Sequence, residues 1–290
     1  MNRIALVDVS SILHSCKHSI GKKHKLSHKE QYTFIIYGFL LRLKTIARNS
    51  LADQLVFCLD SDRSIRRARY FRQYKEGRNK QTKTPDQEYL DEISYPQFNI
   101  VKSEIIPGIG FKNVFMQPGR EADDIMAIIC QEYNEHEIVI VSSDEDMYQC
   151  LARNVSIMKP RDFRWYNITN FRAEFGIDPV DWKKVKMYAG CKSDFVPGIP
   201  GVGNATAIKF LHNELSPTTK AFQAIMAKEN KIILRRNKII TSLPLVGTKP
   251  CKIVRDDSLS RKALIDICKR YNFKSIYEDI KDFSLTLKLR

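Results

Sequence analysis

Acidic side chains recur where short apolar segments of the chain end. The three apolar segments are Ile4–Val7, Leu55–Leu59 and Ile138–Val141. The acids that follow them are Asp8, Asp60, Asp144 and Asp146. Three further carboxylates stand together before the third segment, at Glu121, Asp123 and Asp124. Carboxylates gathered in one place raise one another's pKa values unless a cation neutralises them.

The oxygen-rich character of this set favours a hard divalent cation. Carboxylate oxygens suit Mg²⁺ or Mn²⁺, which also accept phosphate oxygens and water. Two such ions about 4 Å apart can activate water for phosphodiester hydrolysis. Any single acid could instead cap a helix or favour its macrodipole. Capping does not require three acids at one helix start and an acid after every apolar segment, so we favour metal binding.

The apolar segments before the acids are typical of buried strands. They are rich in β-branched residues and helix-length stretches separate them, which predicts an α/β domain with a mostly parallel sheet. Apolar residues recur at helical spacing in Gln31–Asn49 and Ala122–Tyr133, which predicts helices there. Because the carboxyl ends of parallel strands meet at one edge of a sheet, the acids should converge there.

Two other stretches resemble nucleic-acid-binding segments in composition. From residue 61 to 83 arginine and lysine dominate, with aromatic residues interleaved. This pattern fits phosphate neutralisation and base stacking better than a solvated helix face. Residues 188–212 carry a glycine-rich turn that leads into a helix, and from about residue 216 the chain reads as basic and helical.

The overall composition is that of a basic globular protein. Among 290 residues, 48 Lys and Arg against 33 Asp and Glu give a formal net charge of +15, which suits a polyanionic partner. Seven scattered cysteines without a CxxC pair argue against a zinc site and a disulfide framework. The chain opens on a strand-like run rather than a signal sequence, and no apolar run approaches the roughly 18 residues of a membrane span. We expect a cytoplasmic monomer without membrane contact.

The order of these motifs resembles the 5′-nuclease family, which includes bacteriophage flap endonucleases and the 5′-nuclease domain of bacterial DNA polymerase I. The segments that carry the resemblance are Asp8, Asp60, Glu121–Asp124, Ser143–Asp146, Gly190–Asp194 and Gly198–Ala207. The run Tyr74-Lys75-Glu76-Gly77-Arg78 matches the family's arch motif. Leu234–Ile240 is similar to the C-terminal region of the phage proteins, the branch that the chain resembles most.

The resemblance implies a PIN-like 5′-nuclease fold with a divided organisation. Residues 1–180 would form the metal-dependent nuclease core, with a helical arch at 61–95. Residues 181–290 would form a helical DNA-binding region with a helix–turn–helix near 188–212.

The resemblance also implies roles for single residues. The first metal site and its immediate surroundings would be built by Asp8, Asp60, Glu121, Asp123 and Asp124. The second would be built by Asp144, Asp146 and Asp194. Lys75 and Arg78 would act in catalysis by stabilising charge at the scissile phosphate. The other catalytic residues would be Asp8, Asp60, Asp123 and Asp124, through the metal that they hold. The further DNA contacts would be Arg67, Tyr74, Gly198, Gly201, Gly203 and Lys209, with the glycines gripping the duplex around a K⁺ ion.

Two positions depart from the family pattern Gly-Asp-x-x-Asp-Asn. Cys191 replaces its first Asp and Phe195 replaces its Asn. A thiol is a poor ligand for Mg²⁺. We therefore expect the second ion to bind weakly, or to have its coordination completed by substrate and water.

These inferences predict a structure-selective 5′→3′ exonuclease and flap endonuclease that acts on branched or 5′-ended DNA in replication or repair, for example in primer removal. The resemblance extends the substrates to the RNA strand of an RNA·DNA hybrid. A PIN-like ribonuclease is an alternative, although such domains are usually shorter and lack the arginine-rich arch and the glycine-rich turn. A catalytically silent DNA-binding scaffold is the other alternative, and Cys191 keeps it open.

Overall fold

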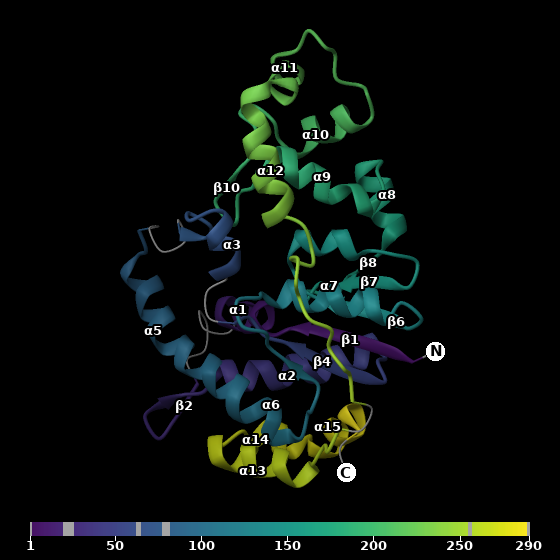
Figure 1. Ribbon diagram of the computed structural model, residues 1–290. Helices are drawn as coiled ribbons and strands as arrows, with labels where there is room; N and C mark the ends of the chain where they lie inside the picture. The colour runs from purple at the N-terminus through teal and green to yellow at the C-terminus, as the bar shows by residue number, and fades with distance from the viewer. Residues whose placement is uncertain (1, 20–25, 62–64, 77–81, 255–256, 289–290) are drawn as a thin grey trace.

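A six-stranded sheet lies at the centre of the molecule (Figure 1). The computed structural model describes residues 2–19, 26–61, 65–76, 82–254 and 257–288. The strands of the sheet are β1 (Arg3–Asp8), β4 (Gln54–Cys58), β5 (Val114–Phe115), β6 (Glu137–Val141), β7 (Val155–Met158) and β8 (Trp165–Tyr166). Their order across the sheet is β5-β4-β1-β6-β7-β8, and neighbours run parallel except β7 and β8.

Successive side chains of a strand point to opposite faces, so β1 contributes to two cores. Ala5 and Val7 face a core that also contains residues of α1 (Val9–Ser19), α2 (Phe34–Ser50), α5 (Pro85–Ile100), α6 (Ile106–Ile109), α13 (Arg261–Tyr271), α14 (Lys274–Glu278) and α15 (Ile280–Leu287). Ile4 and Leu6 face a core that also contains residues of α7 (Ala122–Glu132), the 3₁₀ helix η2 (Glu145–Cys150), α8 (Ile168–Phe175), α9 (Pro179–Ala189) and α10 (Asn204–Leu211). Burial on both faces explains why these strands read as continuous apolar runs.

The remaining elements lie around this sandwich. Two small hairpins are formed by β2 (Ser27–His28) with β3 (Gln31–Tyr32), and by β9 (Gly190–Cys191) with β10 (Val196–Pro197). The other helical segments are α3 (Ile65–Tyr70), the π-helical turn η1 (Val101–Ile105), α11 (Lys220–Met226), the 3₁₀ turn η3 (Lys228–Asn230) and α12 (Lys231–Ile240). In Figure 1, α9–α12 rise above the sheet, whereas α13–α15 lie at the opposite end of the molecule.

The α/β class with a mostly parallel sheet is confirmed, and the three predicted strands lie within or overlap β1, β4 and β6. Strands β5 and β8 have two residues each, and β8 pairs antiparallel with β7, so neither leaves a clear apolar run in the sequence. Within the described residues, no helix combines the length and the apolar content needed to cross a bilayer.

The C-terminal helices differ from the organisation implied by the resemblance. Residues 181–290 were expected to form one DNA-binding region, but α13–α15 bury Leu264, Phe283 and Leu287 in the core beside α2. Their amphipathic faces cover α2 and α6, whose apolar sides would otherwise meet water. Residues 62–64 and 77–81 of the expected arch fall outside the described residues; within the remainder, α3 and the start of α5 are helical.

Candidate active site

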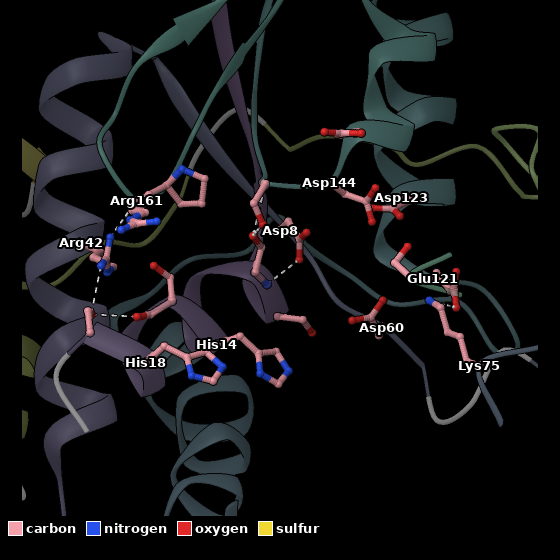
Figure 2. A pocket seen from close by; sticks show the side chains of 18 of the residues that line it. Asp8, His14, His18, Arg42, Asp60, Lys75, Glu121, Asp123, Asp144 and Arg161 are labelled. Carbon is pink, nitrogen blue, oxygen red and sulfur yellow. Dashed lines mark hydrogen bonds and ion pairs between the residues drawn. The ribbon is translucent and has the colours of Figure 1, made fainter. Parts of the chain in front are cut away.

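Carboxylates from distant parts of the chain meet at the carboxyl edge of the sheet. Asp8 is the last residue of β1, Asp60 follows β4, and Asp144 follows β6. Because β1 lies between β4 and β6 and all three run parallel, their ends are adjacent. Glu121 and Asp123 join them from the start of α7, and all five carboxylates line one cavity of about 940 Å³. Figure 2 shows these side chains around a common space.

Backbone and hydroxyl donors hold two of these carboxylates in place. Asp8 Oδ1 accepts a hydrogen bond from the Ser11 amide (2.9 Å), and Asp8 Oδ2 accepts one from the Ser142 hydroxyl (2.9 Å). Asp60 Oδ1 accepts the amide of Ala122, the first residue of α7 (2.9 Å). The strand ends and the start of α7 are therefore fixed to one another through the carboxylates themselves.

The first turn of α7 divides its acids between two environments. Residues of a helix are rotated by about 100° per position, so Asp123 and Asp124 point in different directions. Asp123 lines the cavity. Asp124 is fully buried and lies 2.6 and 2.7 Å from the two terminal nitrogens of Arg67, while its Oδ1 also accepts the Leu245 amide (2.8 Å).

This pairing differs from two expectations. Asp124 was expected at the first metal site and in catalysis, but its oxygens are occupied by Arg67 and by backbone amides. Arg67 was expected to contact DNA, but its side chain is only 2% exposed. Both departures have one cause, because a buried charge requires a partner of opposite sign.

Lys75 and Tyr74 reach the carboxylates from the segment after α3. Lys75 Nζ lies 2.6 Å from Glu121 Oε1 and 3.8 Å from Asp194 Oδ1. The Tyr74 hydroxyl lies 2.8 Å from Glu121 Oε2 and 3.0 Å from Asp194 Oδ2. Lys75 therefore places a cation beside the carboxylates, whereas Tyr74, expected to contact DNA, is buried against the acids. Arg78 lies outside the described residues.

The electrostatics of the cavity favour a bound cation. Burial, followed by the negative charge of Asp60, raises the pKa of Asp8 from 3.8 to about 7. Burial and the charges of Asp144, Asp8 and Glu121 raise the pKa of Asp123 well above 3.8. These shifts express the repulsion of clustered carboxylates in a region of low dielectric, which a divalent cation would relieve. The donor set, composed of carboxylate oxygens, fits Mg²⁺ or Mn²⁺.

A second group of possible ligands adjoins the first. The ligand atoms of Asp146, Cys191 and Asp194 lie within 4.8 Å of one another. They line a small cavity whose wall also contains Glu121 and Asp123. Asp144, expected at the second site, instead lines the large cavity with Asp8 and Asp60. The two groups thus share the start of α7 as their common wall.

Lys186 is a functional candidate that the sequence did not reveal. Its Nζ lies 3.2 Å from Asp146 Oδ1, its side chain is 9% exposed, and it lines the large cavity. Burial, followed by the charge of Asp144, raises the pKa of Asp146 to about 6, and the charge of Lys186 opposes this rise. The only signal in the sequence is its place shortly before Cys191. Nothing local indicates that it would meet an acid of η2.

The glycine-rich turn joins β10 to α10, and its glycines line neither of the two cavities. A Cβ on Gly198 would lie 2.2 Å from the carbonyl carbon of Ala189, so this glycine permits close packing against the end of α9. Gly201 has φ +77°, and a Cβ at Gly201 or Gly203 would meet no atom within 4 Å. These two glycines and Lys209 are exposed, and their backbone is open to close approach.

Comparison with known proteins now gives the family. A family model described as the 5′-3′ exonuclease, N-terminal resolvase-like domain, matches residues 3–176, more than half of the chain. The chain belongs to this 5′-3′ exonuclease family. A curated 5′-3′ exonuclease of Buchnera aphidicola is 26% identical to this chain. The likeness covers 97% of each of the two proteins.

The chain also resembles a longer protein and a protein of solved structure. DNA polymerase I of Bacillus caldotenax is 24% identical over 96% of this chain, but the chain spans only 32% of the length of that protein. The structure of the bacteriophage T5 flap endonuclease in complex with DNA and metal ions is similar with a TM-score of 0.72. Its sequence is 18% identical, and the likeness covers 97% of this chain and 98% of that one. The predicted 5′-nuclease fold is therefore confirmed.

Proposed function

We propose that this member of the 5′-3′ exonuclease family is a structure-selective 5′→3′ exonuclease and flap endonuclease. The observation that carries the proposal is the gathering of Asp8, Asp60, Glu121, Asp123 and Asp144 in one cavity beside the Lys75 ammonium. The curated Buchnera aphidicola relative, matched along its whole length, is named a 5′-3′ exonuclease, and the similar T5 structure is a flap endonuclease bound to DNA. The net charge of +15 suits a DNA substrate.

The donor set supports a pair of divalent ions as cofactor, Mg²⁺ or Mn²⁺. Asp8, Asp60, Glu121, Asp123 and Asp144 would hold the first ion and its water ligands, and Asp146 and Asp194 would hold the second. When bound, such ions activate a water molecule and stabilise the leaving oxygen of a phosphodiester. The alternative of a silent scaffold is less well supported, because the acids of the large cavity are all present and converge.

The residues of the chain would position the substrate and stabilise charge. Lys75, held beside Glu121, would place a fixed cation near the phosphate that is cleaved, where negative charge develops. Arg78 would assist it. Gly201 and Gly203, exposed at the start of α10, would approach the duplex backbone around a K⁺ ion, with Lys209 one turn further along. The tertiary position of Gly198 supports a packing role instead.

Branched and 5′-ended DNA is the proposed substrate class, and the RNA strand of an RNA·DNA hybrid a further one. The activity would serve primer removal or related steps of replication or repair in the cytoplasm. The arch residues from 61 to 95 and the glycine-rich turn before α10 count against a PIN-like ribonuclease, because such domains usually lack both.

A cleavage assay with two substrates tests the proposal. A 5′-flap DNA and a single-stranded RNA are incubated with the wild type, with Asp123→Asn, and with Asp178→Asn. Asp178 is the matched control because it is an exposed acid that lines neither cavity. We expect flap cleavage that requires a divalent ion, is lost in Asp123→Asn and persists in Asp178→Asn. DNA binding without cleavage would favour the silent scaffold, and cleavage of RNA alone would favour the ribonuclease.

Cys191 should weaken the second metal site. Its Sγ lies 3.8 Å from Asp146 Oδ2 and 3.0 Å from Ser193 Oγ, and a thiol is a poor ligand for Mg²⁺. We expect Cys191→Asp to reach half-maximal cleavage at a several-fold lower Mg²⁺ concentration, because a carboxylate adds a hard ligand and a negative charge. Cys191→Ser is the matched control without added charge. An Mg²⁺ requirement that is identical in all three proteins would contradict this role.

A further inference from the structure

The cavity extends well beyond the carboxylates. Its volume of about 940 Å³ lies at the upper end of the range for small-molecule sites, more than the metal ligands need. Figure 2 shows that Asp60, Glu121, Asp123 and Asp144 lie on one side of Asp8, whereas His14, His18, Arg42 and Arg161 lie on the other. The lining residues of this second side are His14, His18, Arg42 and Arg161, together with Ser15, Ser19 and Pro160, which hydrogen bonds link to Arg42 directly or through Ser19. We call this side the cationic end.

Three elements build the cationic end and support one another. The histidines and serines come from α1, Arg42 comes from α2, and Arg161 comes from the turn between β7 and β8. The Arg42 guanidinium donates hydrogen bonds to the carbonyl oxygen of Pro160 and to Ser19 Oγ, the latter at 3.2 Å. It thereby joins α1 and α2 to the turn that carries Arg161.

The turn itself is closed by its backbone. The Lys159 amide donates to the Arg164 carbonyl (2.9 Å), and the Phe163 amide donates to the Lys159 carbonyl (2.8 Å). Arg161 is exposed at the tip of this closed turn and borders the cavity. A guanidinium on a braced support loses less entropy on binding an anion than one on a loose loop.

The charges of the two ends are opposite. The cationic end contains two arginines, two histidines and two serines, whereas Asp60, Glu121, Asp123 and Asp144 lie at the other end. Arginine matches the geometry of phosphate oxygens, and neutral imidazole and hydroxyl groups also donate hydrogen bonds to them. A nucleic acid strand carries a phosphate at every nucleotide. When one phosphate of a nucleic acid strand lies at the carboxylates, the neighbouring phosphates of that strand therefore lie close to the same cavity.

We infer that the cationic end is a phosphate-binding subsite for the DNA substrate, with Arg161 as its exposed anchor and Arg42 as its brace. The inference rests on the proposed nuclease function and extends it to substrate positioning. The phosphate is either the 5′-terminal phosphate of the cleaved strand or an internal phosphodiester. Both present non-bridging phosphate oxygens to Arg161.

DNA binding without cleavage isolates this subsite. Binding of a 5′-flap or nicked DNA is measured in EDTA as a function of salt for the wild type, Arg161→Ala and Arg161→Lys. Arg164→Ala is the matched control, because Arg164 belongs to the same turn, has a side chain 77% exposed and does not line the cavity. We expect Arg161→Ala to weaken binding about tenfold. It should also reduce the slope of log K against log salt by about one, whereas Arg161→Lys keeps the slope and Arg164→Ala resembles the wild type.

Cleavage kinetics with 5′-phosphorylated and 5′-hydroxyl ends separate the two sources of phosphate. If Arg161→Ala increases KM only for the 5′-phosphorylated substrate, the subsite binds the terminal phosphate. If it increases KM equally for both substrates, the subsite binds an internal phosphodiester. Equal binding and equal salt slopes for Arg161→Ala and Arg164→Ala would overturn the inference while leaving the nuclease function intact. A wild type that binds DNA with the expected dependence on Arg161 but cleaves nothing would overturn the proposed function alone.

Discussion

At the scale of single residues, Lys75 shows how the chain brings a cation to a pocket of acids. Its φ of +56° lies in the left-handed region, which is unfavourable for a side chain other than glycine. Its amide donates to the Asp194 carbonyl (2.9 Å), and its ammonium lies 2.6 Å from Glu121. Backbone and side chain are thus both anchored at the carboxylates, and such anchoring offsets the conformational cost.

Removal of the Lys75 ammonium should affect chemistry more than affinity. We expect Lys75→Ala to lower single-turnover cleavage of a 5′-flap by about a hundredfold or more, because a fixed cation at the developing charge is lost. Duplex binding should change little, since it is spread over many phosphates. Lys281→Ala, at an exposed position of α15, is the control. Loss of affinity with unaltered turnover would reassign Lys75 to anchoring.

At the scale of elements, the buried Arg67–Asp124 pair connects three segments. Arg67 belongs to α3, Asp124 belongs to α7, and the segment that follows α12 adds the Leu245 amide to Asp124. Arg67 Nε also donates to the carbonyl of Ile240, the last residue of α12 (3.0 Å). The pair therefore holds the base of the arch segment and the end of α12 against the helix that presents Glu121 and Asp123.

Breaking this pair should destabilise the fold. Arg67→Met or Asp124→Leu alone leaves one buried charge without its partner, which costs about 3–5 kcal/mol. Urea unfolding in EDTA should show this loss for each single variant, and the double variant should recover a large part of it. If Asp124 were a metal ligand instead, Asp124→Asn would weaken Mg²⁺ binding while the stability of the metal-free protein stayed unchanged.

At the scale of the whole molecule, a basic protein concentrates acids in one cavity. The net charge of +15 favours a polyanionic partner, while burial raises the pKa of Asp8 to about 7. A carboxyl group with a raised pKa in the folded state binds protons more tightly there than in the unfolded chain. Its contribution to stability is therefore complete below the unfolded value of 3.8 and is lost as the pH rises through about 7.

Metal ions should stabilise the protein most at high pH. We expect the melting temperature in EDTA to fall between pH 5 and pH 8. The increase in melting temperature produced by Mg²⁺ should be larger at pH 8, because the carboxylate ligands are already deprotonated there. Asp8→Asn should reduce the pH dependence of the metal-free protein. An Mg²⁺ effect of equal size at both pH values would contradict a carboxylate site with raised pKa values.

The sequence by itself determined the features that local pattern and strand order encode. Apolar runs ending in Asp8, Asp60 and Asp144 predicted buried parallel strands, and parallel strands place their carboxyl ends together. The motifs also predicted the 5′-nuclease family, which the match to residues 3–176 confirmed. The buried strands and the family motifs follow from short stretches of chain and from strand order. They can be predicted without the positions of side chains that are distant in the sequence.

The tertiary structure decided which side chains face which partner. Asp123 and Asp124 are neighbours in the sequence, yet one lines the cavity and the other pairs with Arg67, 57 positions away. Lys186 meets Asp146, and Arg161 reaches the cationic end, only because separate elements pack together. Charge pairing in a low-dielectric interior depends on the final arrangement of all neighbours, and no local pattern encodes it.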